Sequence, residues 1–399
     1  MAVVISTLLI LLTAWSGTAT HNEPLVTLGT RLNTAQVQDT LTTNSTRLCV
    51  EQNLTIPLIA TDSFYDPLNG EIYLTNAGGV IAVNLTTSTY KVVSPLGGGR
   101  NPVSFAFDGT NDRVFVGNYF QDSLSVVDAR NDTVIHQIPL TISPYEVLYD
   151  PFNGMVYVAG EGSSVAYWNL TTVSSVSYSV VSNIPILPFP GGLALDPNTN
   201  TLFVANDNGY NVTLVNLTSD TLVGDILVGP EPNAILYDGT TGEIYVDLSG
   251  YSQVAVINPT TNTVVNRIPI PGLSSSGAMA VSPVTGTLYV GSANGVVTVN
   301  VSDDQVAGNT QVWEGARALI PPSSISISPD GLKAYVTGFS DGGRLYVMLL
   351  NGGCAIMGPT SGSPVWTQPW FFLTILVIGI LVAATVILAL RRKTAKSHS

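Results

Sequence analysis

The sequence predicts an all-β protein: a seven-bladed β-propeller with four-stranded blades, followed by one C-terminal transmembrane helix. A motif that returns seven times predicts the number of blades. Four short apolar runs within each return predict the strands of a blade. An uncharged apolar segment near the C-terminus predicts the membrane helix.

The repeated motif is a turn followed by a short strand, which first appears as YDPLNGEIYLTN at residues 65–76. Its aromatic residue marks each repeat, and successive markers are 42 to 46 residues apart. Each blade of a propeller is one supersecondary unit of this length, so seven returns predict seven blades. The markers are Tyr73, Phe115, Tyr157, Phe203, Tyr245, Tyr289 and Tyr335.

The internal order of a repeat is clearest in the second one. Runs rich in Val, Ile and Phe alternate with turns that contain Gly, Asn, Asp or Pro, which is typical of strands. A solenoid of stacked hairpins is the alternative, but equal units without a distinct capping repeat favour a closed ring. The four expected strands are PVSFAF (102–107), RVFVGN (113–118), SLSVVD (123–128) and TVIHQI (133–138).

The marker strands IYLTN, VFVGN, VYVAG, LFVAN, IYVDL, LYVGS and AYVTG resemble the YVTN-type β-propeller repeat, and the similarity covers residues 47–350. The resemblance implies the propeller fold. It implies little about activity, because that family includes archaeal surface-layer proteins and secreted bacterial proteins with varied roles. The seventh unit departs from the pattern, since no good fourth strand follows RLYVMLL (344–350).

A strand that precedes the first repeat can supply the missing one. RLCVEQ (47–52) lies at the spacing of a fourth strand before the first marker, so we expect it to close the ring and to remove the exposed edges. Closure would bring Cys49 near Cys354, and an exported protein favours a disulfide between them. Such a bond contributes roughly 4–5 kcal/mol in chain-entropy estimates. Two free buried thiols are the alternative.

The two ends of the chain predict export and a membrane anchor. An apolar stretch followed by small residues indicates a signal peptide cleaved after Ala19, with an uncleaved anchor as the alternative. Basic residues directly after the apolar segment should stay in the cytoplasm, which leaves the propeller outside. The expected parts are the signal peptide (1–19), a polar lead-in (20–46), the propeller (47–354), a Pro/Gly/Ser tether (355–370), the transmembrane helix (371–390) and a basic cytoplasmic tail (391–399).

The charge balance restricts the partners. Only 10% of the residues are charged, the net charge is −13, and four of the 14 basic residues lie in the last nine positions. An acidic ectodomain repels nucleic acid. The expected partners are therefore the membrane, through the C-terminal helix, and other cell-surface proteins or glycans.

Few residues could carry chemistry. His136 is the only histidine of the predicted propeller, so no copper, zinc or haem site is expected. The innermost strands offer only two carboxylates, Asp62 and Glu146, while Ca²⁺ takes six to eight oxygen ligands. We expect no metal or cofactor, with Ca²⁺ or another divalent ion in the channel as the alternative. The innermost positions are Asp62, Ser104, Glu146, Gly192, Ala234, Ala278 and Ser324.

Two further groups of residues are candidates for surface roles. Arg100, in the loop GGGRNP, could bind a ligand carboxylate or sulfate, or it could pair with a local acid. Eight Asn-x-Ser/Thr sequons could carry glycans, although the same residues also begin hairpin turns. Four of them, Asn84, Asn169, Asn216 and Asn300, are expected at the end of a third strand. The full set is Asn44, Asn53, Asn84, Asn131, Asn169, Asn211, Asn216 and Asn300.

These observations favour a non-enzymatic cell-surface protein that binds other surface components, as in a surface layer or an adhesion scaffold. The alternative is an ectoenzyme, a lactonase-like hydrolase or a lyase that uses a divalent ion in the channel. A further alternative, the substrate-capturing accessory subunit of a transporter, fits the topology but has no residue that supports it.

Overall fold

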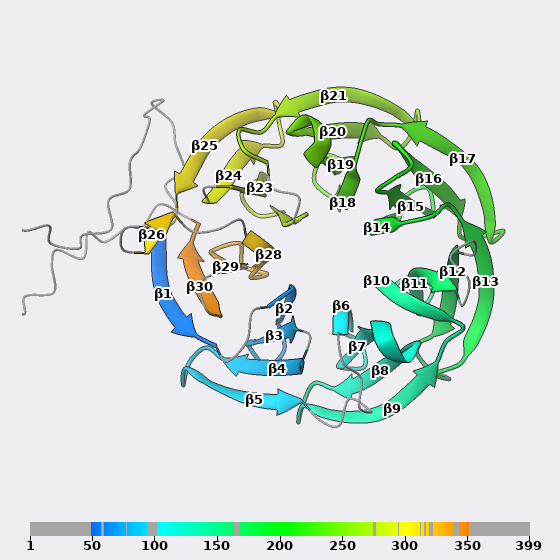
Figure 1. Ribbon diagram of the computed structural model, residues 1–399, viewed down its shortest axis with the longest axis horizontal. Coiled ribbons are helices and arrows are strands. Elements are labelled where there is room, and N and C mark those ends of the chain that lie inside the picture. Colours follow the sequence, from blue (N-terminus) through cyan, green and yellow to red (C-terminus); the bar gives the residue numbers. More distant parts are fainter. Residues whose placement is uncertain are drawn as a thin grey trace, which may run out of the picture. The chain divides into compact units, whose positions relative to one another are not determined.

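The computed structural model describes residues 49–350, apart from 57–59, 77, 94–101, 163–167, 274–276, 294, 312, 315–316, 319–321 and 339–342. This part of the chain forms seven four-stranded antiparallel sheets arranged in a ring. Figure 1 shows one strand of each labelled blade near the centre, such as β2, β10 and β18, and another at the rim, such as β5, β13 and β21. The prediction of a seven-bladed propeller is confirmed.

From the centre outward, blade 1 contains β2 (Asp62–Asp66), β3 (Glu71–Asn76), β4 (Gly79–Asn84) and β5 (Thr89–Val93). Blade 2 contains β6 (Pro102–Asp108), β7 (Arg113–Asn118), β8 (Ser123–Asp128) and β9 (Thr133–Pro139). Blade 3 contains β10 (Ile142–Asp150), β11 (Met155–Gly162), β12 (Trp168–Ser174) and β13 (Val180–Ile186). Blade 4 contains β14 (Pro190–Asp196), β15 (Thr201–Asn206), β16 (Asn211–Asn216) and β17 (Thr221–Leu227).

Blade 5 contains β18 (Pro232–Asp238), β19 (Glu243–Leu248), β20 (Gln253–Asn258) and β21 (Thr263–Pro269). Blade 6 contains β22 (Met279–Ser282), β23 (Thr287–Ser292), β24 (Gly295–Asn300) and β25 (Gln305–Gln311). Blade 7 contains β28 (Pro322–Ile327), β29 (Lys333–Gly338), β30 (Arg344–Leu349) and β1 (Cys49–Thr55). Two 3-10 turns, η1 (Tyr119–Gln121) and η2 (Ser249–Tyr251), and a short hairpin, β26 (Trp313–Glu314) and β27 (Arg317–Ala318), complete the elements.

The ring is closed by the N-terminal strand, as predicted. β1 pairs antiparallel with β30, so that Cys49 lies opposite Leu349 and Thr55 lies opposite Arg344. An ion pair of 2.7 Å between Lys333 Nζ and Glu51 Oε2 joins β1 to β29. The last blade is therefore built from both ends of the propeller, which leaves no blade with a missing strand.

The hydrophobic core lies between the blades rather than within one layer. Each of seven buried clusters joins two neighbouring blades, because the middle strands are packed on both faces. All six residues of β8 are buried, whereas β9 at the rim is mostly exposed. The marker aromatics are all buried in these clusters.

The marker residue also links its blade to the next one. The Tyr73 hydroxyl donates to Asp132 Oδ1 of blade 2 at 2.6 Å, and the Tyr245 hydroxyl donates to Asp304 Oδ1 of blade 6 at 3.2 Å. In blade 2 the marker is Phe115, which packs edge-on against Tyr178 of blade 3 with ring centroids 6.4 Å apart. The repeated motif is therefore a blade-to-blade contact.

The ring has two faces with different loops. One side of the ring carries the turns between the second and third strands of each blade, such as 119–122. It also carries the links that enter each inner strand, such as 187–189 and 229–231, and we call this side the upper face. Backbone hydrogen bonds join these two sets of loops, as from Leu140 N to Asp122 O at 2.7 Å. The lower face carries the other turns of each blade.

No helix of the described residues is long and apolar enough to cross a membrane. The segments predicted as signal peptide, lead-in, tether, transmembrane helix and tail (1–46 and 355–399) lie outside the described residues.

Candidate functional site

A pocket of about 240 Å³ lies where the inner strands of all seven blades converge. Both carboxylates that the repeat register assigned to the channel, Asp62 and Glu146, line it. So do four of the other innermost positions predicted from the sequence. The hydroxyl of the seventh, Ser104, accepts a hydrogen bond from Val147 N at 3.2 Å. The four are Gly192, Ala234, Ala278 and Ser324.

Small residues line one side of the pocket because the inner strands of blades 4 to 6 pack backbone against backbone. A Cβ atom on Gly191 would lie 2.5 Å from the carbonyl oxygen of Asn233, which is closer than real contacts allow. A Cβ atom on Gly277 would lie 3.2 Å from the Cβ of Ala234. Packing therefore accounts for the glycine and alanine positions, and the carboxyl and hydroxyl groups of the pocket come from the other blades.

Hydroxyl groups hold Asp62 in place on the polar side. Asp62 Oδ1 accepts hydrogen bonds from Ser63 N at 2.7 Å and from Ser324 Oγ at 3.1 Å. The Ser324 hydroxyl also lies 2.8 Å from the Ser63 hydroxyl, so blades 7 and 1 are joined by a polar seam at the centre of the ring.

The two carboxylates have different proton affinities. Burial raises the pKa of Asp62 to about 6, although its hydrogen bonds partly oppose this. Burial and then the charge of Asp62 raise the pKa of Glu146 to about 8. Asp62 is therefore expected to release its proton at lower pH than Glu146. Such a pair can transfer a proton or attract one cation.

The pocket does not supply the ligands of a built metal centre. Ca²⁺ takes six to eight oxygens, and the pocket offers two carboxyl groups with hydroxyls that already bond to each other. Among the residues that the structure describes, no group of three or more His, Cys, Asp or Glu side chains could hold a metal ion.

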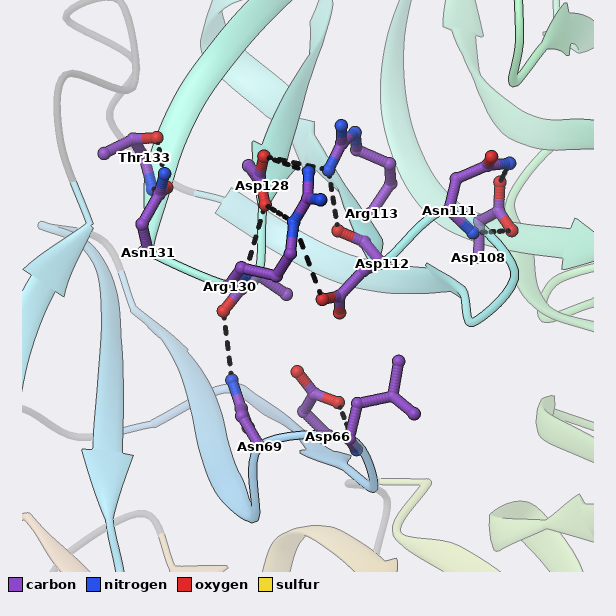
Figure 2. Close-up of polar contacts among 12 residues, drawn as sticks. Asp66, Asn69, Asp108, Asn111, Asp112, Arg113, Asp128, Arg130, Asn131 and Thr133 are labelled. Atoms are coloured by element: carbon purple, nitrogen blue, oxygen red, sulfur yellow. Dashed lines mark hydrogen bonds and ion pairs between the residues drawn. The ribbon is translucent and has the colours of Figure 1, made fainter.

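A network of charged residues lies at the seam between blades 1 and 2 on the lower face (Figure 2). Arg130 donates to the Asp128 carboxylate through Nε at 2.9 Å and through Nη2 at 2.7 Å. Arg113 Nη1 lies 3.1 Å from the same carboxylate. The hydrogen bond from Arg130 holds the pKa of Asp128 below its usual value. Asn69 of blade 1 donates to the backbone oxygen of Ala129 at 3.1 Å. The ion pairs therefore lie within blade 2, and the hydrogen bond from Asn69 joins blade 1 to them.

The sequons at third-strand ends act as turn residues. Asn84 Oδ1 accepts hydrogen bonds from the backbone N of Thr86 and Thr87 at 3.1 and 3.0 Å, and Asn216 and Asn300 begin their turns in the same way. Among the others, Asn131 is exposed in a blade 2 turn and Asn211 begins β16.

The structure corrects the expected position of Asn169. It was expected at the end of a third strand, but it is the second residue of β12, where it pairs with Gly160 and Pro185. The apolar, β-branched run WNLTTVS continues as a strand through the sequon, and Ser174 takes the turn position that asparagine holds elsewhere. Its hydroxyl accepts from Ser177 N at 3.2 Å.

Several candidate residues cannot be placed. Arg100, Cys354 and Asn44 lie outside the described residues, and the side chains of Cys49 and Asn53 in β1 are not described. The disulfide between Cys49 and Cys354 and the ligand role of Arg100 therefore stay predictions. His136 is exposed on β9 and stacks on Tyr178, with ring centroids 5.2 Å apart.

The sequence reasoning missed a group of aromatic residues on the upper face: Tyr119, Phe120, Tyr145, Trp168 and Phe189. Tyr145 lies near the start of β10, the inner strand of blade 3, and Phe189 lies in the link that leads into β14, the inner strand of blade 4. The signal was present in part, because both aromatic residues stand directly before or within the start of an inner strand.

Comparisons with known proteins identify the fold only. No protein family matches the sequence, and no curated protein matches it either. Among solved structures the chain is similar to Kuenenia stuttgartiensis hydrazine synthase, with a TM-score of 0.59 and 18% sequence identity over 72% of this chain and 94% of that chain. At this identity the similarity extends to the propeller fold and not to the activity.

Proposed function

We propose that the chain is a non-enzymatic binding protein of the cell surface, a propeller held outside the membrane by the apolar segment 371–390 as part of a surface layer or an adhesion scaffold. The likeness of the marker strands to the YVTN repeat supports this proposal, because that family includes surface-layer proteins. The predicted signal peptide and the basic residues after the apolar segment support the orientation.

The observation that carries the proposal is the exposure of aromatic side chains on the upper face. Phe120 is 70% exposed, Tyr251 59%, Tyr210 55% and Phe189 45%. Several exposed aromatic residues on one face indicate an interaction surface, because a partner would bury their apolar area, whereas a single one such as Phe152 does not. The charged residues of the lower-face network bind one another instead.

Proximity labelling on intact host cells tests this proposal. The labelling enzyme is fused to the full chain, and the matched control carries it on residues 355–399 without the propeller. We expect the full chain to label itself or an abundant coat protein beyond the control. Recovery of only scarce enzymes or transporters, or of nothing beyond the control, would contradict a scaffold role.

A divalent-ion ectoenzyme is the second candidate, because Asp62 and Glu146 line the same pocket. Thermal unfolding of the full chain in CaCl₂ and in EDTA, with Glu146→Gln alongside, separates the two. If the protein is a binding scaffold without a bound ion, we expect each chain to melt at the same temperature in CaCl₂ as in EDTA. A Ca²⁺-dependent rise that Glu146→Gln abolishes would favour the enzyme, since ligands stabilise the state they bind.

A further inference from the structure

Five aromatic side chains form a continuous line across the upper face of blades 2, 3 and 4. Neighbouring ring planes are inclined by 41° to 83°, so that rings meet edge to face or tilted. We call this line the aromatic ladder. Its centroid distances are 5.0 Å for Phe120–Tyr119, 5.1 Å for Tyr119–Tyr145, 5.4 Å for Tyr145–Trp168 and 4.9 Å for Trp168–Phe189.

The ladder is buried in the middle and exposed at its ends. Trp168 is 3% exposed, whereas Phe120 is 70% and Phe189 45% exposed. Phe189 also adopts a left-handed backbone conformation with φ of 60°, which is unfavourable for a residue with a Cβ atom. Such strain persists where surrounding structure holds it and is frequent at binding sites. The buried rings therefore fix the position of exposed ones.

Polar groups accompany the ladder along its length. The Tyr119 hydroxyl lies 3.3 Å from the Tyr145 hydroxyl and donates to Glu161 Oε2 at 3.4 Å. Asp122, beside Phe120, accepts a hydrogen bond from Ser143 Oγ at 2.6 Å. These carboxylates have further acceptor capacity, since each has two oxygens.

Trp168 has a polar group that the protein does not satisfy. Its indole Nε1 is buried and has no hydrogen-bond partner, although buried donors in proteins are almost always paired. A ligand that reached this N–H would gain a hydrogen bond by accepting from it, in addition to any that it donates to Glu161.

We propose that the aromatic ladder is a binding platform for a neutral oligosaccharide. A pyranose ring has an apolar C–H face that can lie against an aromatic ring, and hydroxyls that both donate to carboxylates and accept from N–H groups. The exposed rings at the two ends of the ladder, Phe120 and Phe189, suit a chain of such units rather than a single one. The inference deepens the proposed binding role and rests on it.

Charged ligands fit the ladder less well. Cations are attracted to ring faces and carboxylates, but they bind best where rings surround one point, and an ammonium group has no acceptor for the N–H of Trp168. Acidic glycans are disfavoured by the net charge of −13. A neutral saccharide meets both the donor and the acceptor requirements.

Titration of the full chain tests the platform. The chain is produced without N-glycans and kept in a polyoxyethylene detergent, so that neither attached glycans nor a sugar headgroup occupies the ladder. The probes are maltohexaose, cellohexaose, mannohexaose and chitohexaose, with hexalysine as the cationic probe, and the readouts are calorimetry and tryptophan fluorescence. We expect at least one neutral probe to bind with Kd below about 1 mM.

Variants of the ladder residues locate the site. Phe120→Ala and Phe189→Ala should each weaken that binding about tenfold, and Trp168→Phe should weaken it while keeping a ring in place. Phe152→Ala is the matched control, because Phe152 is 75% exposed on the lower face, and it should leave the affinity unchanged.

Three results would overturn the inference: no binding of any neutral probe, binding of hexalysine alone, or an equal loss in Phe152→Ala. None of these would decide the proposed function, because labelling on host cells would still recover protein neighbours of a scaffold. Conversely, saccharide binding with no surface neighbour would retain the platform and reject the scaffold.

Discussion

At the scale of single residues, the first turn of a blade depends on an acid whose two oxygens have separate roles. Asp66 Oδ1 accepts from Leu68 N at 2.8 Å, as in the equivalent turns of blades 2 to 5. The second oxygen is bound by the residue three positions later in blades 2, 4 and 5. These donors are Asn111 at 2.7 Å, Thr199 at 2.6 Å and Thr241 at 2.9 Å.

The second oxygen is left without a partner in blades 1 and 3. Asp66 Oδ2 and Asp150 Oδ2 are buried and make no hydrogen bond. Burial raises the pKa of Asp66, and the charge of Asp112 adds to this. Tyr149 stands directly before the turn acid of blade 3. Its hydroxyl lies near the carboxylate of Asp108, which is the turn acid of blade 2. Phe107 occupies the equivalent position beside blade 1 and has no hydroxyl.

Phe107→Tyr should therefore stabilise the protein. The added hydroxyl would donate to Asp66 Oδ2, and satisfying a buried acceptor is worth about 1 kcal/mol or more. The expected result is a higher midpoint in denaturant unfolding with an unchanged slope. Phe107→Leu is the control, since it removes the ring without adding a donor and should lower the midpoint. An equal or lower midpoint for the tyrosine variant would refute this account of the unpaired oxygen.

At the scale of elements, the inner strands of blades 4 and 5 determine the shape of the axial pocket. β14 and β18 approach so closely that Gly191 has no room for a side chain. Gly191→Ala should push these strands apart and destabilise the protein by about 2 kcal/mol or more, in the range of overpacked core variants. Gly239→Ala is the matched control, because its Cβ would meet only a Tyr237 ring atom at 3.9 Å.

Thermal unfolding of both glycine variants checks this prediction. A melting temperature for Gly191→Ala equal to that of Gly239→Ala would show that the inner strands can move apart freely, against the close backbone packing described for the pocket.

The sequence was sufficient for most elements because propeller strands are short, apolar and bounded by turn residues. The four strands expected in blade 2 match β6 to β9 to within one residue, and RLCVEQ (47–52) supplies β1. The register also placed Asp62 and Glu146 at the pocket. Asn169 was misplaced because one sequon pattern serves both as a turn and, in β12, as a strand. The hairpin of β26 and β27 was not foreseen.

The aromatic ladder could not be predicted from local patterns. Its rings come from three blades, and their contacts depend on how the blades pack in space rather than on spacing along the chain. The same holds for the unpaired indole of Trp168, since hydrogen-bond partners of a buried group are not visible in a sequence.

At the scale of the whole molecule, three buried acids make stability depend on pH. Burial raises the pKa values of Asp62 to about 6 and of Glu146 to about 8. Burial, with a contribution from the charge of Asp207, raises that of Asp247 to about 8. The folded chain therefore keeps protons that the unfolded chain has already released, so the free energy of unfolding falls as pH rises from about 4 to about 8.

Denaturant unfolding between pH 4 and pH 9 measures this slope. Glu146→Gln removes one of the titrating groups, so the free energy of unfolding should decrease less between pH 5 and pH 8 than it does in wild type. Asp247→Asn should have the same effect. Asp303→Asn, at an exposed turn, is the control and should leave the slope unchanged. A wild-type stability that rises over this range would contradict the burial of these carboxyl groups.

The central claim is that this propeller acts by binding through its upper face. The most direct measurement is proximity labelling on intact host cells with the wild-type chain, the double variant Phe120→Ala/Phe189→Ala and the control Phe152→Ala, at equal surface amounts. We expect the double variant to lose the neighbours that wild type and Phe152→Ala share. An identical set of neighbours for all three chains would show that the upper face is not the binding surface.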